Sequence, residues 1–73
     1  MKNFFEDGVK YGEKISRCTY NLIVDLIAER ARMYEMYAGI EESNQFVKGA
    51  ASAIISNVNV ENDVIEKNKQ IEK

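Results

Sequence analysis

The chain has no histidine, proline or tryptophan, and Cys18 is its single cysteine. One cysteine excludes a disulfide within the chain and, without histidine, leaves no ligand set for a structural zinc ion. The residues after Met1 lack the apolar run of a signal peptide, and no stretch of the sequence is apolar enough to cross a bilayer. We therefore expect a cytoplasmic protein that does not bind membranes.

An excess of positive charge is also missing. Lys and Arg number 10 and Asp and Glu number 12, which gives a formal net charge of −2, and the two signs are interspersed. Because nucleic-acid phosphates are bound by clustered basic residues, DNA or RNA binding is not expected. The sequence contains no nucleophile motif, phosphate-binding loop or metal-ligand cluster, so we expect neither an enzyme nor a cofactor.

What the chain does contain is helix-period apolar spacing along nearly all of its 73 residues. Apolar residues recur on one face from Phe4 onward, and Gly39 followed by Ile40 suits the end of a helix. The pattern predicts a helix over about 4–38, a turn over about 39–41 and a second helix over about 41–70. If the chain ran helically through Gly39, the alternative would be a single rod that needs a partner along its length.

The second predicted helix carries two neighbouring apolar stripes. Residues 57–60 alternate at period two and include β-branched side chains, so a break there, followed by a short third helix to about Gln70, is an alternative.

A two-helix hairpin of this size covers only one apolar stripe, and a domain this short buries only about 60% of its unfolded surface. We therefore predict an all-α hairpin that assembles into a homo-oligomeric helical bundle. The predicted oligomer interface consists of Phe46, Val47, Gly49, Ala50, Ala53, Ile54, Asn57 and Val58.

Two groups of residues are candidates for binding. The first is a recognition patch for a protein partner, because arginine and aromatic residues are enriched at binding hot spots. It consists of Arg30, Arg32, Met33, Tyr34 and Tyr37. The alternative for Arg30 is an ion pair with a structural role, because it interrupts the apolar face of the first helix.

The second group surrounds two glycines spaced four residues apart. One interpretation is a hollow for a flat, anionic ligand, with glycine as its floor and lysines supplying charge. This candidate consists of Phe4, Gly8, Lys10, Tyr11, Gly12 and Lys14. The alternative is close packing of a crossing helix on the glycines.

We expect a small, non-catalytic oligomer that acts by binding another macromolecule, most simply a protein, as an adaptor, inhibitor or regulator. The alternative is a protein that binds or sequesters a small ligand, such as an anionic nucleotide, in pockets between subunits. Stabilisation of the folded chain by nucleotides in a thermal-shift screen would favour the alternative.

Overall fold

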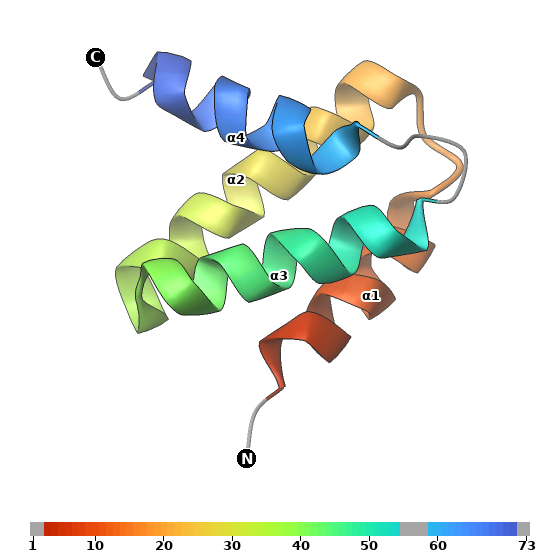
Figure 1. The fold of residues 1–73 in the computed structure, drawn as a ribbon. Helices are drawn as coiled ribbons and strands as arrows, with labels where there is room; N and C mark the ends of the chain where they lie inside the picture. Colours follow the sequence, from red (N-terminus) through yellow and green to blue (C-terminus); the bar gives the residue numbers. More distant parts are fainter. Residues whose placement is uncertain (1–2, 55–58, 72–73) are drawn as a thin grey trace.

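The computed structural model describes residues 3–54 and 59–71, which form four helices and no strand (Figure 1). The helices are α1 (Phe4–Ile15), α2 (Tyr20–Ala38), α3 (Ile40–Ala53) and α4 (Val60–Ile71). The prediction of an all-α fold is confirmed. The hairpin is replaced by a bundle of four shorter helices.

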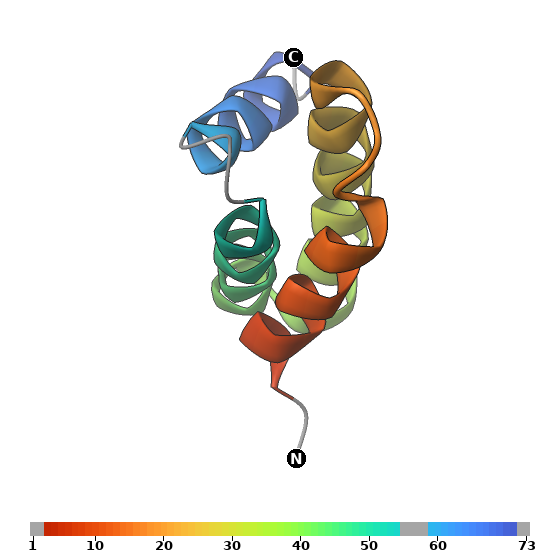
Figure 2. The same ribbon diagram turned by 90° about the vertical axis from the view of Figure 1, so that its right-hand side faces the viewer.

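The helices form two layers, with α1 and α2 in one and α3 and α4 in the other (Figure 2). The Cα atoms extend 34 × 28 × 15 Å. The shortest extent fits two helices packed about 8–10 Å apart, each with a Cα radius of about 2.3 Å. Contacts between the layers dominate, since α3 packs on both α1 and α2, and α4 packs mainly on α2.

The continuous helix predicted over 4–38 was wrong, because the helix stops at Ile15 and restarts at Tyr20. The amide of Cys18 donates to the carbonyl of Ile15 at 3.0 Å and closes the end of α1. Thr19 has an extended backbone at the N-cap position of α2, which hydroxyl-bearing residues favour. The sequence pattern did not reveal the break because the apolar residues stay in phase across it.

The predicted end of a helix at Gly39 is confirmed. Gly39 has a φ of 113°, which residues with a Cβ rarely adopt, and its amide donates to the carbonyls of Tyr34 and Glu35 at the end of α2. The helix does not continue through this residue, so the single rod is excluded.

The second helix predicted over 41–70 was also wrong as a continuous element. α3 ends at Ala53 and α4 begins at Val60, so the alternative of a short third helix in this region was correct. Residues 55–58, including the predicted interface residues Asn57 and Val58, lie outside the described residues.

The described residues of the predicted oligomer interface lie inside the single chain. Phe46, Val47, Gly49, Ala50 and Ile54 are buried, and Ala53 is partly buried. Their assignment to a contact between subunits is corrected: α1, α2 and α4 of the same chain pack against α3 and cover these residues. Breaks in both predicted long helices allow this, because each yields a further short helix that folds back on the rest.

The crossing of α1 and α3 brings two helix backbones into direct contact. A Cβ atom on Gly8 would lie 2.1 Å from the carbonyl oxygen of Phe46, and one on Gly49 would lie 2.0 Å from the carbonyl oxygen of Phe5. At Gly12 the corresponding distance is 2.5 Å to the carbonyl oxygen of Ala50. The two backbones therefore touch at positions where no side chain intervenes, and glycine is required by space alone.

Candidate functional site

Large apolar side chains are exposed where α2 turns into α3. Met33 is 45% exposed, Met36 87%, Tyr37 79% and Ile40 61%. Met33, Met36 and Tyr37 lie within two turns of α2, so they project from one side of that helix, and Ile40 begins α3. We call these four residues the α2–α3 corner. Four such side chains within eight positions form a patch that water penalises.

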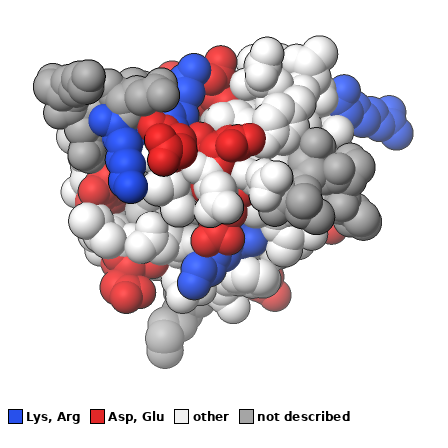
Figure 3. Space-filling view, turned by 45° about the horizontal axis from the view of Figure 1, so that its top comes forward, with Lys and Arg blue, Asp and Glu red and all other residues white. Residues whose placement is uncertain are grey.

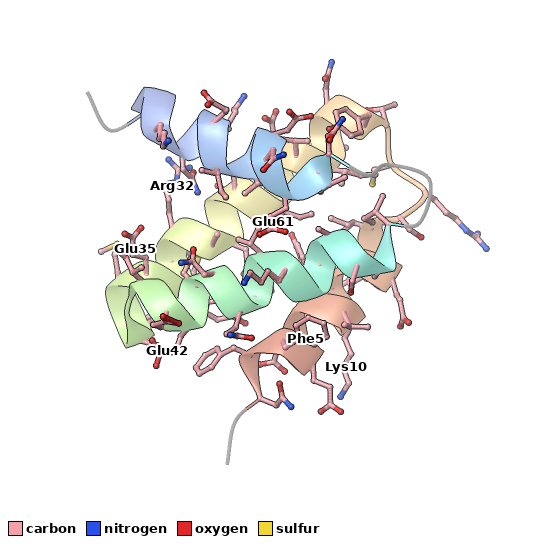
Figure 4. The ribbon with its side chains drawn as sticks, in the orientation of Figure 1. Phe5, Lys10, Arg32, Glu35, Glu42 and Glu61 are labelled. Atoms are coloured by element: carbon pink, nitrogen blue, oxygen red, sulfur yellow. The ribbon has the colours of Figure 1, made fainter. Side chains whose placement is uncertain are left out.

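Carboxylates surround the α2–α3 corner. Figure 4 places Glu35 at the end of α2 and Glu42 at the start of α3, and Glu41 precedes Glu42 on the first turn of α3. Arg32 also projects from α2, on the side of α4. Acidic side chains therefore outnumber basic ones around the apolar patch, which favours a partner surface that is apolar at its centre and basic at its edge.

The apolar surface of the corner continues into a groove between α3 and α4. The groove has a volume of about 150 Å³. Its floor includes buried Val47 and Val64, and exposed Ile40 and Ile65 stand among its lining residues. The groove adds an indentation into which a partner side chain can fit. Ile40 and Ile65 were not predicted as site residues, although an apolar residue directly after the helix-ending Gly39 is a usable signal.

The five residues of the predicted recognition patch do not lie together. Met33 and Tyr37 belong to the α2–α3 corner, and Arg32 is half-buried on the side of α4. Tyr34 instead packs inward, with its ring centroid 4.6 Å from that of Phe46. Two of the five residues therefore contribute to the exposed patch.

Arg30, the fifth residue of that predicted patch, contacts α1. Its guanidinium carbon lies 4.7 Å from the ring centroid of Tyr11. Arg30 is exposed, so its charge is not buried, and this cation–π contact links the side chain to α1.

Arg30 and Tyr34 join the second predicted group at a cleft between α1 and α2. The cleft has a volume of about 320 Å³. Its cations are Lys10, Lys14 and Arg30, its aromatic residues are Tyr11, Tyr34 and Phe46, and its carboxylate is Asp7. The sequence analysis grouped Lys10, Tyr11 and Lys14 as parts of the glycine-floored hollow, with the lysines supplying its charge. That Arg30 faces them depends on the angle between α1 and α2, which spacing does not encode. We call this cavity the α1–α2 cleft.

The hollow floored by glycine was wrong. Gly8 and Gly12 face the backbone of α3, which occupies the space that a ligand would need. Phe4 does not wall a cavity with them, because its ring packs edge-on against Tyr34 with centroids 5.7 Å apart. The alternative interpretation, close packing of a crossing helix, was correct.

A third cavity, of about 420 Å³, is lined by residues of α2 and α4. Figure 3 shows acidic and basic side chains interspersed on the face toward α4. Lys67 pairs with Asp25 at 2.6 Å, and the Tyr20 hydroxyl donates a hydrogen bond to Asp63. This hydrogen bond, with smaller contributions from burial and the carboxylate charge, raises the pKa of Tyr20. The hydrogen bond between Tyr20 and Asp63 links α2 with α4.

Comparisons with known proteins give no match to a family model, a curated protein or a solved structure. Within residues 3–54 and 59–71, no three or more acidic or cysteine side chains gather in a way that could hold a metal ion. None of the helices in that part of the chain combines the length and apolar character needed to span a membrane.

Proposed function

We propose that this protein is a non-catalytic binding module that attaches to another protein through the α2–α3 corner. The observation that carries the proposal is the exposure of Met36 and Tyr37, 87% and 79%, the two highest values among the large apolar side chains of the described residues. Flexible methionine and amphipathic tyrosine side chains suit contact with an irregular protein surface. In such a role the protein would work as an adaptor, inhibitor or regulator.

The chemistry of the corner also describes its partner. Burying apolar surface against a partner contributes about 25 cal/mol to the free energy of binding for each Å² removed from water. With four large apolar side chains, the corner would therefore form the centre of the interface. Glu35, Glu41 and Glu42 around it favour Lys or Arg at the edge of the partner surface. We infer a partner with an apolar patch flanked by basic residues.

Photo-crosslinking tests the proposal whatever the identity of the partner. A benzophenone amino acid replaces Met36 in one variant and Glu13, an exposed residue of α1, in a matched control. In cells that produce the protein, irradiation should join the Met36 variant to a protein of discrete mass, and Tyr37→Glu in the same chain should abolish the adduct. The Glu13 variant should not form it.

Two results would contradict the proposal. One is the absence of a discrete adduct from a Met36 variant that is folded by circular dichroism. The other is an adduct of twice the mass of the chain and nothing else, because that result would assign the corner to self-association.

A further inference from the structure

The α1–α2 cleft gathers positive charge on a chain whose formal net charge is −2. Lys10 and Lys14 face the cleft from α1 and Arg30 faces it from α2, against the single carboxylate of Asp7. Like charges four residues apart on a helix repel each other, and a third cation from another helix adds to the cost. A bound anion would remove this repulsion.

Both lysines are available to a ligand. Within the described residues, no carboxylate lies within 4.0 Å of the amine of Lys10 or Lys14, and both side chains are exposed. Figure 4 shows the Lys10 side chain projecting from α1. Neither amine therefore has to give up an ion pair in order to bind an anion.

Arg30 is held in a defined position, unlike the lysines. Its guanidinium lies over the Tyr11 ring at 4.7 Å, and that ring is itself 5.7 Å from buried Phe46. Arg30 is exposed, and within the described residues no carboxylate lies within 4.0 Å of its guanidinium, so its N–H groups are able to donate to a ligand. Two parallel N–H groups match two oxygens of a phosphate, and holding them in place lowers the entropy lost on binding.

We propose that the α1–α2 cleft binds a small phosphorylated ligand. Arg30 donates to two phosphate oxygens, and the amines of Lys10 and Lys14 neutralise the remaining charge. A volume of about 320 Å³ is at the lower end of the range for small-molecule sites, so the ligand is small. The cleft shares no residue with the α2–α3 corner, and the two proposals therefore stand or fall separately.

The test is a titration followed by two-dimensional NMR, with pyrophosphate and ATP as probes and sodium chloride added to equalise ionic strength. We expect saturable shifts of the Tyr11 and Arg30 resonances with a Kd on the order of 1 mM or tighter. Tighter binding of ATP than of pyrophosphate would identify a nucleotide, and equal binding would identify the phosphate group as the recognised part. Both results support the proposal.

The variants separate a site from general charge attraction. The double variant Lys10→Gln, Lys14→Gln should weaken binding at least about tenfold, because it removes two charges that would contact the phosphate. Both lysines are exposed, so their loss leaves the fold intact. Adding Arg30→Gln to this double variant should weaken phosphate binding further. The control is Lys48→Gln, which removes a lysine charge from α3 two positions after Phe46, on the opposite side of that helix. Absence of saturation below roughly 10 mM, or equal weakening by Lys48→Gln, would overturn the proposal.

Discussion

Replacing Gly8 with alanine tests the contact on which the two-layer packing depends. On an exposed helix, Gly→Ala stabilises by about 1 kcal/mol, since alanine has the higher helix propensity. Here the new Cβ would lie 2.1 Å from the carbonyl oxygen of Phe46 and 2.8 Å from the amide of Ala50, whereas ordinary contacts begin at 3.4 Å. Both neighbours are backbone atoms of a helix and cannot rotate away, so the structure predicts the opposite sign.

The size of the effect follows from the displacement that the Cβ requires. The helices α1 and α3 would have to separate by more than about 1 Å, which opens their shared interface along its length, because packed cores tolerate little added volume. Overpacking costs about 1–3 kcal/mol and occasionally more, and a clash with backbone atoms of two α3 residues places Gly8→Ala at about 3 kcal/mol or above. A chain of 73 residues has a total unfolding free energy of about 4–11 kcal/mol, so the loss is a large fraction of it.

Urea denaturation followed by circular dichroism measures this loss. We expect a lower midpoint for Gly8→Ala with an unchanged slope, and a melting temperature lower by on the order of 10 °C or more. Glu13→Ala, on the exposed side of the same helix, should change the unfolding free energy by less than about 0.5 kcal/mol. A Gly8→Ala protein as stable as the parent or more so would refute the crossing of α1 and α3.

Three further predictions concern other contacts. Ser43→Ala should lower the unfolding free energy by about 1 kcal/mol in urea denaturation, because the buried Ser43 hydroxyl donates to a carbonyl of α2 at 2.7 Å. Ser52→Ala, which loses a hydrogen bond within its own helix, should change the unfolding free energy little. Equal effects of the two substitutions would contradict the prediction. Tyr20→Phe should remove a pH dependence of the unfolding free energy. The hydrogen bond to Asp63 raises the pKa of Tyr20, so the stability that this bond contributes is complete below about pH 10 and declines as the pH rises past that value. Parallel curves of stability against pH for parent and variant would refute the link. Met36→Ser should leave the thermal midpoint within about 2–4 °C of that of the parent, because Met36 is exposed. The same substitution should remove the adduct formed by a benzophenone amino acid placed at position 37. A large loss of stability would instead place Met36 in the core.

The sequence was sufficient for the features that are encoded locally. Helical periodicity predicted the fold class, and Gly39 marked the end of α2 because a positive φ is a property of that one residue. The alternation at residues 57–60 was the signal for a break before α4, although the sequence pattern favoured a continuous helix over about 41–70. These signals do not depend on which helix packs against which.

The sequence was not sufficient to decide what covers an apolar stripe. The apolar residues of α3 have the same spacing whether α1 of the same chain or a second chain lies against them, so Phe46 and Ala50 were assigned to a contact between subunits. Missing the break between Ile15 and Tyr20 caused this error, because a continuous first helix has no segment free to fold back.

The candidate sites also differ in how far the sequence alone predicted them. Lys10, Tyr11 and Lys14, which were predicted around a hollow floored by glycine, line the α1–α2 cleft instead, and Met33 and Tyr37 are both exposed at the α2–α3 corner. That Arg30 belongs with the first group depends on the angle between two helices, which no pattern along the chain records.

The backbone contact between α1 and α3 has a consequence for the order of events during synthesis. The first helix leaves the ribosome long before the helix against which its backbone must rest, and in between it has only α2 as a neighbour. Its apolar side therefore stays exposed to water, or to a chaperone, until α3 is made. A chain that ends ahead of Phe46 would leave that side of α1 uncovered and would be prone to aggregate.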